Sequence, residues 1–153
     1  MYVDRLNEFC DNVALNTGAA GTYLIGNQID LVVARDIGMG MGGQLYLVAQ
    51  VSEAATSGGS ATLQLQLASD STAAIATDGT ASIHLTSATF AVAALTAGKV
   101  LMVMPLPLEG VAYERFLGIR QITGTAAFTG GKVDVFLTTD PQVWKAYADE
   151  GSR

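Results

Sequence analysis

The sequence predicts an all-β fold, an antiparallel β-sandwich with jelly-roll-like connections between its strands. Short runs that alternate apolar and polar residues fill the chain from Gln44 to Asp140. Turn-forming residues separate these runs roughly every ten positions, a spacing typical of sandwich strands. The clearest run, Thr62–Leu67, has leucine at every second position, so one face of that strand is expected to be buried and the other solvated.

We interpret the 153 residues as a single domain, because a chain of this length can bury a sufficient core without disulfides or metals. The domain consists of an N-terminal arm (1–22), a sandwich (23–140) and a short C-terminal tail (141–153). In the arm, apolar residues spaced three to four apart predict a short amphipathic helix, which would be ordered by a partner: Leu6, Phe9, Cys10 and Val13.

A strand is expected at 29–34, followed by a glycine-rich segment at 38–43. Gly38, Gly40 and Gly43 match the spacing of a dinucleotide-binding loop. Such a loop must open a helix, whereas the residues after Gly43 alternate as a strand does, so we reject a dinucleotide site. Met39 and Met41 are flanked by glycines, and we expect them to pack either on the sheet or against a partner.

Further strands are expected at 44–51 and 61–68, near 83–85 and at 90–94, with a short run at 73–76 between turns. The segment Val100–Met104 is apolar on both faces, which predicts a central strand or a strand whose outer face is covered by a second subunit. The runs 115–122 and 132–138 flank a turn rich in glycine and threonine, and this arrangement predicts a hairpin.

In the tail, Asp140 and Pro141 suit the N-cap and first turn of a short helix. Trp144 and Tyr147 would then lie on one face of that helix, together with Val143. An extended tail is the alternative interpretation.

Composition excludes several classes of function. The net charge is −6, and the 8 lysines and arginines are scattered singly, so we expect no direct binding to nucleic acid. The longest apolar stretch, Val100–Leu108, is broken by prolines and is far shorter than the ~20 residues of a membrane span. Hydrophobic residues make up 50% of the chain and charged residues 14%, which indicates that part of the surface faces another protein.

Residues that carry chemistry are sparse. Cys10 is the sole cysteine and His84 the sole histidine, so there is no internal disulfide and no basis for a histidine metal site or a catalytic triad. We expect Cys10 to be buried and His84 to lie on the solvated face of its strand. The sequence therefore predicts a binding or structural protein with no catalytic site, no cofactor and no metal.

A resemblance to a known family rests on two segments: Asp30–Gly40 leading into Leu45–Val48, and Arg115–Arg120 with 124–125 and 131–133. They resemble the cement or decoration proteins of tailed-phage capsids, especially the small cement protein of the Bordetella short-tailed phage type. The resemblance implies a jelly-roll-like virion protein, made in the host cytoplasm and bound to the outer capsid surface. It also implies a homodimer that bridges major capsid protein subunits, so that many modest contacts together resist the pressure of packaged DNA.

On this interpretation, seven residues are expected to contact the capsid or a second subunit: Leu6, Phe9, Val13, Met39, Met41, Trp144 and Tyr147. The alternative is a carbohydrate- or receptor-binding β-sandwich module of a phage fibre. Such modules use exposed aromatic side chains to stack on sugar rings, and aromatic residues are 7% of this chain, with several expected inside the fold. We therefore favour the capsid protein as the partner.

Overall fold

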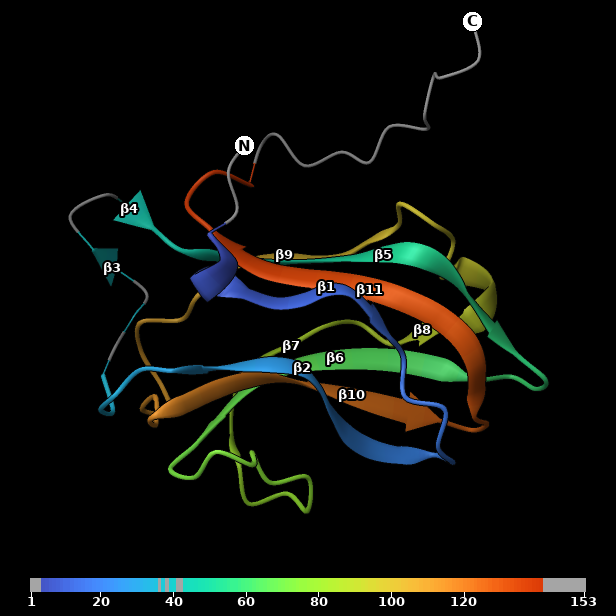
Figure 1. Cartoon of the computed structure of the whole chain (residues 1–153), viewed down its shortest axis with the longest axis horizontal. Coiled ribbons are helices and arrows are strands. Elements are labelled where there is room, and N and C mark those ends of the chain that lie inside the picture. The colour runs from blue at the N-terminus through green and yellow to red at the C-terminus, as the bar shows by residue number, and fades with distance from the viewer. Residues whose placement is uncertain (1–3, 36, 38, 41–42, 142–153) are drawn as a thin grey trace, which may run out of the picture.

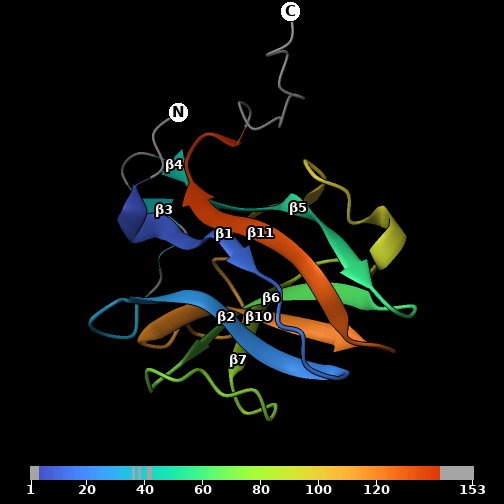
Figure 2. The same cartoon turned by 45° about the vertical axis from the view of Figure 1, so that its right-hand side comes forward.

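The computed structural model describes residues 4–35, 37, 39–40 and 43–141. Two antiparallel sheets pack face to face as a sandwich (Figures 1 and 2), which confirms the predicted fold class. The described elements are η1 (Arg5–Asn7), β1 (Glu8–Ala14), β2 (Gly21–Asp30), β3 (Met39–Gly40), β4 (Gly43–Gln44), β5 (Tyr46–Ser57), β6 (Thr62–Asp70), β7 (Ser82–Thr86), β8 (Phe90–Ala91), η2 (Val92–Ala94), β9 (Val100–Pro105), β10 (Phe116–Gly124) and β11 (Phe128–Thr138).

The strand order is that of a jelly roll. The first sheet has the order β1-β11-β5-β9, and the second has the order β2-β10-β6-β7, with β8 also pairing with β6. When these eight sheet strands are numbered along the chain without β3, β4 and β8, the sheets read 1-8-3-6 and 2-7-4-5, the order of two interlocked Greek keys. No helix in the described part of the chain is long and apolar enough to cross a membrane.

The core lies between the two sheets. Leu63, Leu65 and Leu67 of β6 are at most 1% exposed, so the predicted inner face of this strand is confirmed. Burying each such side chain contributes roughly 1.5–3 kcal/mol to the hydrophobic stabilisation. The other largest fully buried side chains come from both sheets and their connections: Phe9, Phe128, Phe136, Leu47, Leu95, Leu106, Leu117, Ile119 and Gln121.

The predicted hairpin over 115–138 is wrong in its pairing, although both strands exist. β10 lies in the second sheet and β11 in the first, so the turn between them carries the chain across the sandwich. β10 pairs with β2 and β6, while β11 pairs with β1 and β5. Alternation of apolar residues specifies a strand and its buried face but carries no information about its partner.

The predicted amphipathic helix in the arm is also wrong. Residues Glu8–Ala14 form β1, which pairs with β11, and both Phe9 and Cys10 are fully buried. The register shifts on either side of Cys10, so adjacent residues point inward and the apolar spacing imitates a helix. At Gly26, where φ is +68°, a Cβ would lie 2.2 Å from the carbonyl oxygen of Phe9, so glycine is needed for β2 to approach β1 this closely.

The apolar strand predicted at Val100–Met104 is β9, and it lies at the edge of the first sheet rather than at its centre. Val103 is 42% exposed and Met104 38%. The strand ends at Pro105. Proline has no backbone N–H to donate to a neighbouring strand, and an edge strand tolerates this because it has a neighbour on one side only. The idea that a second subunit covers this strand stays a prediction.

The outer face of the second sheet is less exposed to solvent than the alternation of apolar and polar residues predicts. Gln66 and Arg120, which face each other on β6 and β10, are 8% and 4% exposed. Ile75, from the loop that joins β6 to β7, packs over Gly118, where a Cβ would lie 2.7 Å from its Cδ1 atom. The run predicted at 73–76 is therefore a loop that covers this face.

Candidate functional site

Five of the exposed large apolar side chains belong to three segments at one end of the sandwich, the end that lies on the left in Figure 1. They come from η1, from the loop that follows β2 (31–35) and from the loop between β9 and β10 (106–115). Leu6 is 77% exposed, Val32 65%, Val33 58%, Leu108 42% and Val111 56%. Exposed apolar residues concentrated in one region are typical of surfaces that bind other proteins. We call this region, formed by η1 and loops 31–35 and 106–115, the loop end.

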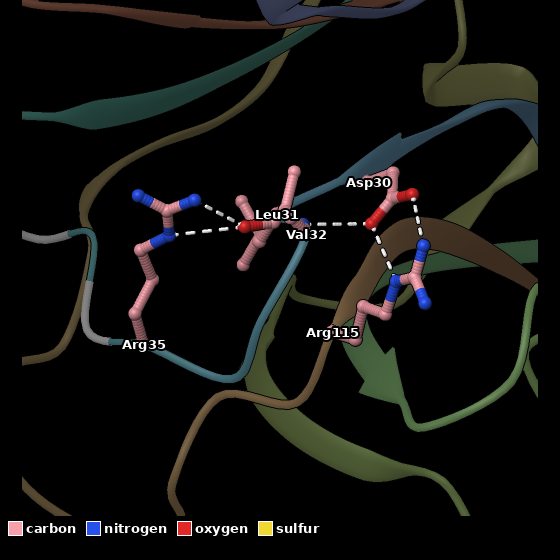
Figure 3. Close-up of polar contacts among 5 residues, drawn as sticks. All are labelled: Asp30, Leu31, Val32, Arg35 and Arg115. Carbon is pink, nitrogen blue, oxygen red and sulfur yellow. Dashed lines mark hydrogen bonds and ion pairs between the residues drawn. The ribbon is translucent and has the colours of Figure 1, made fainter.

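An ion pair joins the two loops of the loop end (Figure 3). The Arg115 guanidinium donates to both Asp30 carboxylate oxygens, at 2.8 Å each. These hydrogen bonds, with a further one from the Val32 backbone N–H at 2.7 Å, lower the pKa of Asp30 to about 2. The Leu31 N–H also donates to the Arg115 carbonyl at 2.8 Å. Asp30 is therefore ionised at all physiological pH values, and the start of loop 31–35 is fixed to the end of loop 106–115.

The same loop carries a strained residue. Val32 has φ of +70°, a left-handed conformation that is rare for a β-branched residue. The Asp30 carboxylate accepts the Val32 N–H. Further along the loop, the Arg35 side chain folds back and donates to the Leu31 carbonyl (Figure 3). These bonds keep Val32 and its neighbour Val33 pointing into solvent. Backbone strain of this kind persists where the surroundings enforce it and is concentrated at functional sites.

A cleft of about 380 Å³ adjoins this loop. Arg5, Leu6 and Glu8 line one wall, and the last residues of β2, 27–30, line the other. η1 is held by Asp4, whose carboxylate accepts the Leu6 N–H at 3.0 Å. The lining mixes two apolar side chains, Leu6 and Ile29, with polar and charged groups, so the cleft suits a side chain or a short segment of another protein better than a small apolar ligand.

Loop 106–115 is anchored by buried groups. Tyr113 is 3% exposed, and its hydroxyl donates to the Pro107 carbonyl at 3.0 Å. The Glu114 N–H donates to the hydroxyl of Ser69 at 3.0 Å. Leu108 and Val111 lie between these anchors, so their exposed side chains are carried by a loop attached near both of its ends.

The prediction that His84 lies on a solvated face is wrong. His84 is half-buried, its Nε2 atom lies 2.7 Å from the Ser69 hydroxyl, and its ring stacks on Tyr113 with 4.0 Å between centroids. The register between β6 and β7 shifts at this point, with Leu67 opposite Leu85 and Ala68 opposite Ile83. This bulge turns the histidine from the outer face toward the edge of the core, which alternation cannot predict.

The described residues offer little for catalysis. They contain no group of three or more histidine, cysteine, aspartate or glutamate side chains that could hold a metal ion. The Cys10 thiol is buried, as predicted, and burial raises its pKa to about 12, so it is not a nucleophile near neutral pH. The exposed apolar side chains of the loop end make it a candidate binding surface.

The predicted contact residues lie in different parts of the structure. Leu6 lies exposed on the loop end, while Phe9 is in the core and Val13 packs, half-buried, against it. Met39 lies in β3, which pairs with β4 near the loop end. Met41, Trp144 and Tyr147 lie outside the described residues. The structure thus places Leu6 on the candidate surface.

Four residues of the loop end were not predicted from the sequence: Val32, Val33, Leu108 and Val111. The two valines continue the apolar run that predicts a strand at 29–34, and this pattern gives no sign that the strand ends at Asp30. The signal that distinguishes them is Asp30, an aspartate that can bind the N–H two residues later and end the strand in a turn. Leu108 and Val111 follow two prolines, which also end a strand.

The model of the Bbp16 family matches residues 9–137, which is most of the chain and spans both sheets. No curated protein matches the chain.

Proposed function

The chain belongs to the Bbp16 family, a family of Bordetella phage proteins, and on this premise we propose that it is a structural protein of the virion that binds the outside of the capsid. Its partner is the major capsid protein, and by bridging neighbouring capsid subunits it stabilises the shell against the pressure of packaged DNA. The loop end is the surface that docks.

The observation that carries this proposal is the pair Val32 and Val33. Both side chains are more than half exposed, and the Asp30–Arg115 ion pair and its hydrogen bonds hold the loop that presents them. An exposed apolar pair on a preformed loop loses little conformational entropy on binding. Burying each valine against a partner contributes roughly 1–2 kcal/mol, which is modest for one contact and large for an array of many.

Charge supports an outer position on the shell. The chain has a net charge of −6, so packaged DNA would repel it, whereas the outside of a protein shell would not. The loop end itself carries apolar side chains and an internally neutralised ion pair, so the chain's excess of negative charge does not oppose docking there.

A second copy of the chain is the other proposed partner. The support for a homodimer is the edge strand β9, where Val103 and Met104 are partly exposed. Sedimentation equilibrium of the free protein measures this directly. A dimer at micromolar concentration agrees with the proposal, and a monomer at all concentrations contradicts it.

The docking proposal is tested with two matched variants. Val33→Asp adds a charge at the loop end, and Ala93→Asp adds the same charge on exposed η2 at the opposite end (Figure 1). We expect Val33→Asp to reduce co-sedimentation with undecorated shells at least tenfold, because a buried unpaired charge is costly, while Ala93→Asp binds like the parent.

Equal binding by both variants would contradict docking through the loop end. Failure of the parent protein to sediment with shells would contradict the capsid proposal itself. Binding to a host-surface glycan in place of shells would favour the fibre module.

A further inference from the structure

A chain of hydrogen bonds links the single histidine to loop 106–115. Ser69, at the end of β6, is fully buried, and its hydroxyl oxygen accepts the Glu114 N–H at 3.0 Å. The same oxygen lies 2.7 Å from Nε2 of His84. His84 thus contacts the loop twice, through Ser69 to Glu114 and through its ring to Tyr113, which is in turn bonded to Pro107.

The number of hydrogens available to these hydrogen bonds determines the tautomer of His84. A serine hydroxyl has one hydrogen to donate, and a buried donor must find an acceptor. Within the described residues, the acceptor placed for the Ser69 hydrogen is Nε2 of His84. This count assigns Nε2 as the acceptor, and in that tautomer the ring is neutral and carries its hydrogen on Nδ1.

Few charged groups face the ring. From loop 106–115, the Glu114 carboxylate acts on it and accepts the Ser82 hydroxyl of β7 at 2.7 Å. From β6, Ser69 faces it, while the adjacent Asp70 carboxylate is turned to the N–H groups of Thr72 and Ala76. Tyr113 faces it through the ring stack, and Arg115 is paired with Asp30. Burial outweighs the Glu114 charge and lowers the pKa of His84.

From this geometry we infer that His84 is a pH-sensitive latch, which holds loop 106–115 against the sandwich when neutral and releases it when protonated. A proton on Nε2 turns that atom from an acceptor into a donor. The Ser69 hydrogen then loses its acceptor inside the fold. The hydroxyl must rotate toward another acceptor, which turns away the lone pair that accepts the Glu114 N–H and weakens that bond. Leu108 and Val111 then lose their fixed position. The loop end therefore docks less well in acid, a consequence that rests on the proposed function.

The test uses the fact that the chain has one histidine, so its ring nitrogens give a single set of NMR signals. At pH 8 we expect the tautomer with hydrogen on Nδ1, and a titration midpoint below the ordinary 6.5. Across that midpoint, amide exchange at Glu114, corrected for intrinsic pH dependence, should accelerate at least tenfold, while exchange at Ile119 in β10 stays constant.

Two variants serve as controls. His84→Gln keeps an acceptor for Ser69 and should protect the Glu114 amide at every pH, whereas His84→Phe keeps the ring stack without an acceptor and should leave it unprotected at every pH. An Nε2–H tautomer at pH 8, or a titration with unchanged Glu114 exchange, overturns the latch.

The consequence for docking is tested by sedimentation with shells on either side of the titration midpoint that the NMR experiment measures. The parent should lose binding on the acid side while His84→Gln retains it. Equal loss by both would overturn the role of the latch in docking. A parent that binds shells at neither pH contradicts the proposed function, whereas the exchange measurement decides the latch independently of shells.

Discussion

Asp30 shapes the loop end through one carboxylate. Its two oxygens bind the Arg115 guanidinium and the Val32 N–H, so a single side chain joins two loops and holds a valine in a left-handed conformation. The pair is about half exposed, and exposed ion pairs contribute little to global stability. The role of Asp30 is therefore local, in the shape of the surface rather than in the fold.

Asp30→Asn separates these roles. The amide oxygen can still accept the Val32 N–H, but the ion pair is lost. Because the folded pKa of Asp30 is lowered to about 2, its charge stabilises the fold above the ordinary aspartate pKa near 4, and this contribution is lost as pH falls toward 2. We expect the variant to be slightly less stable than the parent at pH 7 and equal to it below pH 2 in urea denaturation.

Asp30→Ala also removes the acceptor for Val32, so loop 31–35 should relax. Compared with Asp30→Asn, we expect Asp30→Ala to associate with shells several-fold more weakly. The urea denaturation midpoints of the two variants should be the same. A large fall in that midpoint would show that Asp30 supports the core instead.

At the scale of elements, the sequence predicts strands well and their neighbours poorly. The leucines of β6 alternate strictly, and their burial follows from the two-residue period of a strand. β1 and β7 contain register shifts, so Phe9, Cys10 and His84 point where alternation does not place them. The pairing of β10 and β11 with distant strands depends on the topology of the whole chain, which no local pattern records.

The N-terminal segment gives an element-scale prediction. Removing residues 1–7 deletes η1 and Leu6 but leaves β1 paired with β11, so the protein should still fold while binding shells less tightly. Removing residues 1–14 also deletes Phe9, and truncating a buried phenylalanine alone costs about 3–5 kcal/mol. That cost is comparable to the whole stability of a small domain, so we expect the longer deletion to yield unfolded or insoluble protein.

Circular dichroism and thermal melts of the two truncations make this comparison. A cooperative melt of the longer truncation near the parent midpoint would show that β1 is an appended arm rather than part of the sandwich.

At the scale of the whole molecule, the jelly roll separates a rigid body from the surface that it presents. The two sheets share one core, and the chain's exposed apolar loops project from one end of it. The predicted class and the buried cysteine follow from composition and periodicity. The loop end could not be predicted, because Val32 and Val33 are distant in sequence from Leu108 and Val111, and the Asp30–Arg115 contact that relates them is tertiary.

We propose that this protein binds the outside of a capsid through its loop end, and an electron cryomicroscopy map of decorated shells is the decisive measurement. We predict density for the sandwich on the outer surface, with loops 31–35 and 106–115 facing the capsid subunits and η2 facing solvent. A map in which η2 or the outer face of either sheet contacts the shell, or in which decorated and undecorated shells are the same, would contradict the claim.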